Sequence, residues 1–480
     1  MLEEEYLSHD ALSLATLIAR GEVTELEVLN CAKQIYEKNN PKLNAVITDM
    51  WEEAHRAIET ELPRGQLQGV PMPLKDLGQY YKGVVTSNGS KLFANNIADH
   101  DSTLVQRYKA AGIVLSGKTN SPEFGLATTT EPVLHGPSKN PWSHKHSTGG
   151  SSGGAAAAVA SGMFPVAHAS DGGGSIRIPA SCCGLFGLKP TRGRIPLGPT
   201  SLEGWGGLST THVISRSVRD SAALLDISAG PEPGSPYHAP STSRTFLSAV
   251  AERPSSLKIA LCVEPFNGAQ VCAEVSELTL KQAKELENLG HHIEIMENPF
   301  TPEIVRDSHG TLAICHIGAM LNAKQQLLGR SINEKDVERV TWNNYQSSMQ
   351  VTGPQYAAAV GQVQRHGQMC ATIFEKYDLI FTPTMACLPP KLGALDTMSP
   401  DTETYLSLLY QMIGFTALFN DTGNPAVSVP LAVSESGLPV GCQLIGKFGD
   451  EGLLLSVSQQ LYEAGLFRLP KALQGKSPLH

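Results

Sequence analysis

Segments with a strand-like pattern alternate with helix-like segments along almost the whole chain. The clearest example is an apolar run at 257–263, followed by a helical pattern at 271–289 and a short apolar stretch at 292–296. This order is typical of a βαβ unit. Continued through a chain of 480 residues, it predicts an α/β layer protein whose sheet is mainly parallel.

The other expected elements follow from the spacing of apolar residues and from capping patterns. Thr24 and Glu27 form a capping box that starts a helix running to about residue 39. The stretch 231–254 is rich in Pro, Ser and Gly and predicts a surface connection. Further strands are predicted at 43–47, 112–117, 164–169, 378–381, 426–429 and 440–445, and helical pattern at 51–61, 102–111, 215–227, 302–377 and 451–463.

The composition argues against several classes of protein. Charged residues make up 17% of the chain and the net charge is −9, which disfavours long disordered tails and a basic nucleic-acid surface. No run reaches the roughly 18 apolar residues of a membrane helix, and the acidic N-terminus lacks the features of a signal peptide. The nine cysteines are scattered without a CxxC motif, so we expect reduced thiols and a cytoplasmic location.

Three consecutive glycines, Gly172 to Gly174, stand directly before Ser175. Glycine allows the backbone to fold tightly, and successive N–H groups in such a turn can form an anion-binding nest. Beside a nucleophilic hydroxyl, a nest of this kind serves as an oxyanion hole. The segment therefore indicates either a nucleophile with its oxyanion hole or a plain tight turn with an incidental serine.

A serine nucleophile needs a base, and the sequence offers two candidates. His168 and Asp171 lie too close to Ser175 in sequence for a comfortable relay, so His168 is better interpreted as a core histidine on a strand. Lys75 ends an apolar, proline-stiffened run that starts at Gly69. Burial there would lower the pKa of the lysine and make it a base, whereas the alternative is a solvated surface charge.

A second glycine-rich stretch, 147–154, contains Ser151 and Ser152 and precedes a run of small residues at 155–160. Its glycines tolerate unusual peptide geometry. A hydroxyl from this loop, placed between Lys75 and Ser175, could carry a proton in either direction. The alternative is a flexible loop in which Ser152 starts the following helix.

Together these segments resemble the amidase signature family of serine amidohydrolases. The family's lysine in a PxKD context, its GGSSGG loop and its DxGGSxRxP segment correspond here to Lys75, Ser151 and Ser175. Gly172 is a departure, since relatives often carry a bulkier residue at this position. The resemblance covers nearly the whole chain through further matching stretches at 117–120, 187–193, 215–220, 419–425 and 437–441.

The resemblance implies a Ser–cis-Ser–Lys triad. Ser175 would be the nucleophile, neutral Lys75 the base, and Ser151, after a non-proline cis peptide bond, the proton relay. The implied oxyanion hole consists of the N–H groups of Gly172, Gly173, Gly174 and Ser175, supported by Ser152, Asp171 and Arg177. The implied fold is one compact α/β/α domain over residues 1–480 around a large mixed, mostly parallel twisted sheet. Its catalytic core would lie at about 60–230 and a more helical substrate wall at about 300–377.

Within the family, the stretches 130–132, 165–169, 177–181 and 341–342 resemble the 6-aminohexanoate cyclic-dimer hydrolase group, which cleaves small amides. The expected substrate is therefore a small amide, linear or cyclic. We expect no cofactor and no nucleic-acid or membrane partner; a homodimer is compatible with the sequence, which does not fix the oligomeric state. The resemblance places the substrate pocket at Thr128, Thr129, Thr130 and Cys315, the last with a buried core thiol as its alternative.

Other interpretations remain open. Residues 112–119 match the phosphate-loop pattern GxxxxGK[ST], but their central residues themselves look like a strand. Residues 149–153 match the nucleophile elbow GxSxG, which would make Ser151 the nucleophile of an α/β-hydrolase-type esterase. The chain could also be the amidase subunit of a tRNA-dependent amidotransferase, although it offers no ATP or tRNA site. No metal is expected, because the histidine pairs at 144/146 and 291/292 lack further ligands at metal-site spacing.

Overall fold

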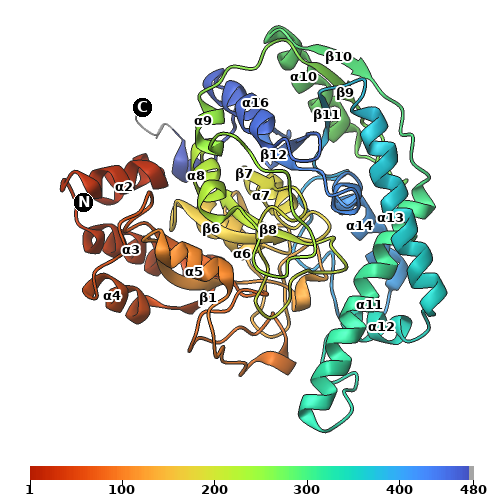
Figure 1. Ribbon diagram of the computed structural model, residues 1–480, viewed down its shortest axis with the longest axis horizontal. Coiled ribbons are helices and arrows are strands. Elements are labelled where there is room, and N and C mark those ends of the chain that lie inside the picture. Colours follow the sequence, from red (N-terminus) through yellow and green to blue (C-terminus); the bar gives the residue numbers. More distant parts are fainter. Residues whose placement is uncertain (475–480) are drawn as a thin grey trace.

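The computed structural model describes residues 1–474, and its largest sheet lies at the centre of the molecule (Figure 1). This sheet has eight strands in the order β10-β9-β11-β13-β12-β7-β8-β6. All seven residues of β13 are buried, and since successive side chains of a strand face opposite sides, both faces of the sheet are covered here. The strands are β6 (Val166–Asp171), β7 (Phe186–Lys189), β8 (Thr210–Ser215), β9 (Lys258–Leu261), β10 (His292–Ile295), β11 (Leu379–Pro383), β12 (Ala426–Val433) and β13 (Pro439–Ile445).

The α/β class and the mixed sheet are confirmed, but the expectation that the sheet is mostly parallel is wrong. The pairs β10–β9 and β9–β11 are parallel, whereas every pair from β11 across to β6 is antiparallel. The predicted βαβ unit is present as β9, α10 (Ala273–Asn288) and β10. Elsewhere β12 and β13 form a hairpin, and β8 inserts between β6 and β7 and runs opposite to both. The alternation of helix and strand along the chain does not reveal such an insertion.

Two smaller sheets belong to the N-terminal part of the chain. β1 (Val46–Asp49), β3 (Val114–Thr119) and β2 (Pro71–Lys75) form a three-stranded sheet in that order, and β4 (Lys139–Asn140) pairs with β5 (Ser143–Ser147). β2 packs beside β6 of the central sheet. This packing brings Lys75, the last residue of β2, close to the glycine-rich segment that follows β6.

Helices surround these sheets. They are α1 (Glu3–Ser8), α2 (Ala11–Ala19), α3 (Glu25–Leu43), α4 (Trp51–Glu59), α5 (Thr103–Ala110), α6 (Gly153–Ala160), α7 (Arg177–Cys183), α8 (Val218–Ser228), α9 (Phe246–Val250), α11 (Pro302–Leu328), α12 (Arg339–Ser348), α13 (Gly353–Ile373), α14 (Thr402–Ile413), α15 (Leu418–Asp421) and α16 (Glu451–Glu463). Three short 3₁₀ helices are η1 (Lys91–Phe93), η2 (Glu123–Gly125) and η3 (Lys471–Leu473). Figure 1 shows α2–α5 on one side of the central strands and α11–α13 on the opposite side.

Most of the predicted elements are present, with shifted ends. The capping box at Thr24 starts α3, which continues to Leu43, and α16 has the predicted bounds. The helix expected at 215–227 begins only at Val218, because residues 210–215 form β8 and the Ser217 side chain caps α8. The mainly helical region expected at 302–377 consists of α11, α12 and α13.

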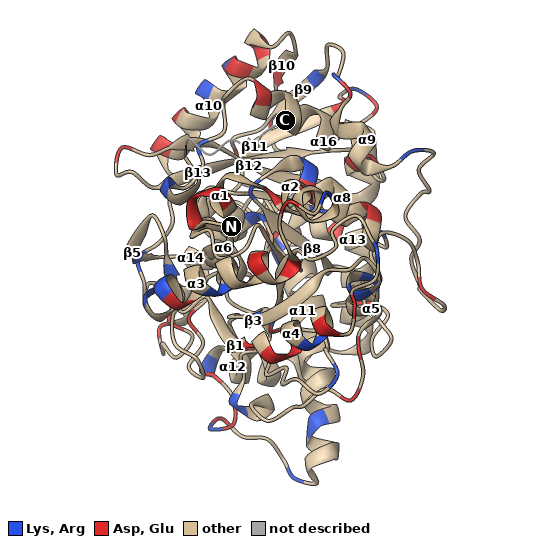
Figure 2. Ribbon diagram, turned by 90° about the vertical axis from the view of Figure 1, so that its left-hand side faces the viewer, with Lys and Arg blue, Asp and Glu red and all other residues tan. Residues whose placement is uncertain are grey.

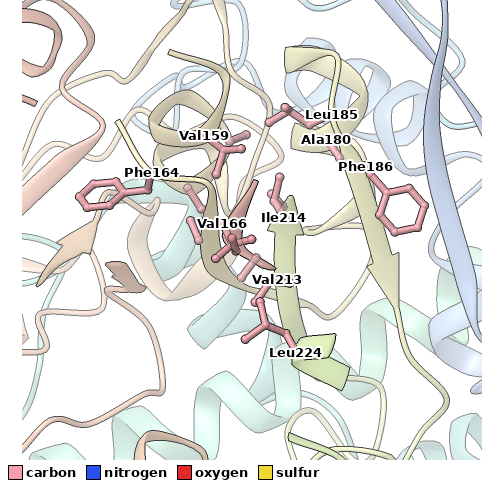
Figure 3. Packing of buried hydrophobic residues seen from close by; sticks show 14 of the residues in the cluster. Val159, Phe164, Val166, Ala180, Leu185, Phe186, Val213, Ile214 and Leu224 are labelled. Atoms are coloured by element: carbon pink, nitrogen blue, oxygen red, sulfur yellow. The ribbon is translucent and has the colours of Figure 1, made fainter. Parts of the chain in front are cut away.

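The main hydrophobic core lies between the central strands and the helices packed on them. Figure 3 shows Val159 of α6, Phe164 and Val166 near the start of β6, and Val213 and Ile214 of β8 among the buried side chains of this core, each 1% exposed or less. Val213 and Ile214 are consecutive and therefore point to opposite faces of the sheet. Burial on both faces makes β6 and β8 a rigid support for the segment that follows β6.

Charged residues are distributed over the outer elements. Figure 2 shows acidic and basic residues interspersed along the peripheral helices and loops. Among residues 1–474, no helix combines the length and apolar character needed to cross a membrane. In the same range no group of three or more His, Cys, Asp or Glu side chains could hold a metal ion, and all nine cysteines are free thiols.

Candidate active site

Lys75 is a fully buried lysine at the end of β2, where all five residues of the strand are buried. Its Nζ lies 2.7 Å from Ser151 Oγ and 3.0 Å from Ser170 Oγ. Burial lowers the pKa of Lys75 to about 7, although the nearby Asp171 carboxylate opposes this shift. The side chain is therefore a neutral amine in contact with a serine hydroxyl above roughly pH 7.

The loop before α6 holds Ser151 against Lys75. The Gly150–Ser151 peptide bond is cis, which confirms the non-proline cis bond expected there. A Cβ atom on Gly150 would lie 2.5 Å from the Thr129 carbonyl oxygen, so this position has room only for glycine. The Thr130 hydroxyl donates to the Gly149 carbonyl and accepts from the Gly153 N–H, each at 3.0 Å. These two hydrogen bonds fix the loop on both sides of Ser151.

Ser152 precedes α6, but its side chain does not cap that helix. Its hydroxyl donates to the Ser170 carbonyl at 3.1 Å and accepts from the Ser170 N–H at 3.2 Å. In addition, the Ser152 N–H donates to the Ser175 carbonyl at 3.3 Å. The Ser152 side chain therefore ties the serine loop to the glycine-rich segment, while its backbone is the N-cap of α6 and its carbonyl accepts the Ala156 N–H at 3.1 Å.

The segment after β6 folds around the Asp171 carboxylate. Asp171 Oδ1 accepts the Gly174 N–H at 2.7 Å, and Oδ2 accepts the Ile176 N–H at 3.1 Å. Because Gly174 donates to Asp171, its N–H is not available to an oxyanion, and including it in the oxyanion hole was wrong. The N–H groups of Gly172, Gly173 and Ser175 make no hydrogen bond within the described part of the chain.

Arg177 holds Asp171 in place. Its Nη2 and Nε donate to the two Asp171 oxygens at 2.8 and 2.9 Å, and both side chains are fully buried. Burial by itself would raise the pKa of Asp171, but the Arg177 guanidinium outweighs it and holds the pKa well below its usual range. Arg177 also donates to the Thr416 carbonyl and to the side chains of Asn420 and Gln443.

These last contacts bring in residues that the sequence analysis did not identify. Thr416 donates from its hydroxyl to the Gly173 carbonyl at 2.7 Å, and Asn420 donates to both the carbonyl and Oδ1 of Asp171. Ser170 is a further omission, since it contacts Lys75 Nζ directly. A serine one residue before Asp171 was a local signal for it; Thr416 and Asn420 lie more than 200 residues away and gave none.

A cavity of about 720 Å³ opens onto Ser175 and Gly173. Its walls come from α11, α13 and α14 and include Ile304, Leu409 and Ile413. Ser151 and Lys75 are not among its lining residues.

Of the predicted pocket residues, only Thr128 lines this cavity. Thr129 and Thr130 do not, because they pack against Gly150 and Gly153 of the serine loop. Cys315 does not line it either, whereas its neighbour Ile314 does. Consecutive helical residues point about 100° apart, so Cys315 of α11 faces elsewhere.

His168 is confirmed as a buried core histidine on β6. Its Nδ1 accepts the Lys75 backbone N–H at 3.2 Å, and its Nε2 contacts the Thr211 hydroxyl. Burial lowers the pKa of His168 well below its ordinary value, and the neighbouring Lys75 and Lys118 lower it further. Both ring nitrogens are thus occupied away from Ser175.

The segments that match the phosphate-loop and nucleophile-elbow patterns do not adopt the structures that these motifs require. In a phosphate loop the lysine follows a turn and opens a helix, but here Lys118 and Thr119 are buried inside β3. In a nucleophile elbow the serine is exposed at the top of the sheet, whereas Ser151 is 2% exposed and contacts Lys75.

Gly174→Ala is expected to lower the free energy of unfolding by about 1–3 kcal/mol. Gly174 has a φ of +134°, and its added Cβ would lie 2.4 Å from Thr416 Oγ1. Urea-induced unfolding measures the effect, with Gly367→Ala on α13 as the matched control, since nothing lies within 4 Å of that position. The control should be neutral or stabilised by about 0.5–1 kcal/mol. Equal stability of the two variants would contradict the tight packing described for Gly174.

Comparisons with known proteins agree on one family. The model of the family described as Amidase matches residues 27–455. The 6-aminohexanoate-cyclic-dimer hydrolase of Paenarthrobacter ureafaciens is 38% identical over 471 residues, which cover 95% of this chain and 94% of the relative. A solved structure of 6-aminohexanoate cyclic dimer hydrolase complexed with substrate is 37% identical with a TM-score of 0.90, covering 98% and 100% of the two chains. A bacterial aryl acylamidase structure of the amidase signature family is 26% identical with a TM-score of 0.85, covering 95% and 96%.

Proposed function

Since this chain belongs to the amidase signature family and is an amidohydrolase, we propose that it cleaves its amide with Ser175 as nucleophile, Ser151 as proton relay and Lys75 as base. The observation that carries this assignment is the 2.7 Å contact between Lys75 Nζ and Ser151 Oγ. A buried lysine whose pKa is lowered to about 7 can accept a proton near neutral pH, which a solvated lysine cannot do efficiently.

In the acylation step, Ser175 Oγ attacks the carbonyl carbon of the amide. Its proton passes to Ser151, whose own proton passes to the Lys75 amine. The N–H groups of Gly172, Gly173 and Ser175 stabilise the negative charge that develops on the carbonyl oxygen. Ser175 is 8% exposed, and in such a largely buried site these donors lower the barrier more than they would in water.

Collapse of this intermediate breaks the C–N bond. Ser151 donates its proton to the leaving amine and recovers one from the Lys75 ammonium, so the relay returns to its starting state. Water then attacks the acyl-enzyme by the same route, giving a carboxylic acid and free Ser175. Asp171 and Arg177 take no proton in this scheme; they keep the nest and Ser175 in position through the contacts described above.

We further propose a small, largely apolar amide as substrate, linear or cyclic, of the type named in its relatives. The cavity beside Ser175 holds about 720 Å³, which lies in the usual range for a small-molecule site. Aliphatic walls such as Ile304, Leu409 and Ile413 suit methylene chains between amide groups. In this proposal α11 and α13 provide the substrate wall expected at about 300–377.

A panel of amides scored by amine release tests this function. It contains a cyclic dimer and linear oligomers of 6-aminohexanoate, a peptide amide, an aryl amide and glutamine. We expect the 6-aminohexanoate amides to give the largest kcat/KM. Release of ammonia from glutamine alone would favour the amidotransferase-subunit alternative, and no amine release from any amide of the panel would overturn the proposal.

A further inference from the structure

His309, on α11, reaches the cavity at the edge of the glycine nest. The residue is 9% exposed and lines the cavity together with Ser175 and Gly173. A Cβ atom on Gly173 would lie 3.1 Å from His309 Nε2 and 3.5 Å from Cε1. The imidazole edge therefore abuts the backbone of the nest, and the absence of a side chain on Gly173 leaves the ring its space.

The other side of the ring is fixed by Asp421 at the end of α15. His309 Nδ1 lies 2.8 Å from Asp421 Oδ1, and His366 Nδ1 lies 3.3 Å from Asp421 Oδ2. Burial by itself would raise the pKa of Asp421, but the two imidazoles outweigh it and lower the pKa, so the group is a carboxylate. A carboxylate only accepts hydrogen bonds, so the contacting Nδ1 of His309 must donate.

This arrangement leaves Nε2 of His309 as the free end of the ring. No hydrogen bond to Nε2 is made by any residue in the range 1–474. When the imidazole carries one proton and Nδ1 holds it, Nε2 presents a lone pair. The cavity thus has two different polar features side by side: N–H donors from the nest and an acceptor from His309.

We propose, resting on the function proposed above, that His309 Nε2 accepts a hydrogen bond from an N–H group of the substrate outside the scissile bond, and that it selects diamides over monoamides. The carbonyl under attack needs the N–H donors of the nest, and a second carbonyl oxygen at Nε2 would be repelled. An apolar group there would leave the lone pair without a partner, which is costly in a buried site. An N–H satisfies it, and a cyclic dimer or linear oligomer of an amino acid carries a second secondary amide.

Asp421 is a positioning residue in this account. It does not line the cavity and acts through the proton on His309 Nδ1. His366 contacts the same carboxylate, is 3% exposed and does not line the cavity either. It therefore provides a matched control, because its replacement disturbs the same buried cluster without removing the acceptor.

The test compares two substrates at about pH 8.5, above the pKa of Lys75. One is a linear diamide of 6-aminohexanoate units; the other is identical except that CH₂ replaces the NH of the non-scissile amide. For the unmodified protein we expect a kcat/KM about 10- to 100-fold higher for the diamide. In His309→Phe this ratio should fall to within about threefold of unity, whereas His366→Gln should retain it.

The possible results separate this inference from the function on which it rests. If the unmodified protein cleaves both compounds with equal kcat/KM, the inference is overturned and the proposed function stands; this measurement needs no variant. If His309→Phe lowers kcat/KM for both compounds alike and keeps their ratio, His309 is structural and the inference also fails. If the unmodified protein cleaves neither compound nor any amide of the panel, the proposed function itself falls.

Discussion

Ser175→Ala is expected to lower kcat/KM for amide hydrolysis by at least about ten-thousand-fold, because it removes the atom that forms the acyl-enzyme. The fold should persist. The Ser175 side chain lines the cavity, and its hydroxyl makes no hydrogen bond within residues 1–474, so its loss should change the unfolding free energy by less than about 0.5 kcal/mol.

Amine release from the substrate that the panel selects measures the activity of Ser175→Ala, and thermal unfolding measures its stability. Ser436→Ala is the control, since Ser436 is exposed on the hairpin between β12 and β13, and it should behave as the unmodified protein. Activity of Ser175→Ala within about tenfold of the control would contradict a nucleophilic role.

Lys75→Ala and Lys75→Arg should both be almost inactive. Arginine keeps a positive charge but stays protonated, so it cannot accept the proton that Ser151 passes on. In the unmodified protein the pKa of Lys75 is lowered from 10.5 to about 7, so the neutral, active form is gained as the pH rises. The activity should therefore increase through about pH 7 and level off above it.

The control for this prediction is Lys118, another fully buried lysine. Burial lowers its pKa to about 8, but its Nζ donates to the Gln79 carbonyl at 2.6 Å and makes no contact with Ser151. Lys118→Met is expected to destabilise the protein while keeping the rise in activity near pH 7. A Lys75→Arg variant with most of its activity, or a pH profile that is flat from pH 6 to about 9, would rule out Lys75 as the proton acceptor.

The parts of the site that lie close together in sequence could be predicted from it. Lys75, the serine loop and the glycine-rich segment each carry a local pattern, and the helix and strand spacing around them was sufficient to give the α/β class. Asp171 and Arg177 could also be identified from the sequence, because both belong to the Ser175 segment. In each of these short segments, the polar residues of the site stand next to the residues that determine the local backbone conformation.

The remainder depended on the order and direction of strands, which local patterns do not encode. The sequence patterns predict no strand at 210–214 and a helix from 215, whereas β8 spans Thr210–Ser215 and lies between β6 and β7, antiparallel to both. Thr416 and Asn420 reach Asp171 and Gly173 only because α15 and the turn before it pack on the nest. The residues of the cavity wall are likewise far apart in the sequence. The sequence points to Cys315 as a pocket residue, whereas its neighbour Ile314 lines the cavity.

The most direct test of the central claim is the site of covalent modification by an activated phosphonate that reacts with nucleophilic serines. Peptide mapping by mass spectrometry of the modified protein should place a single adduct on Ser175. Modification should be strongly slowed in Lys75→Ala and absent in Ser175→Ala. An adduct on Ser151, with Ser175 unmodified, would contradict the account and make Ser151 the nucleophile.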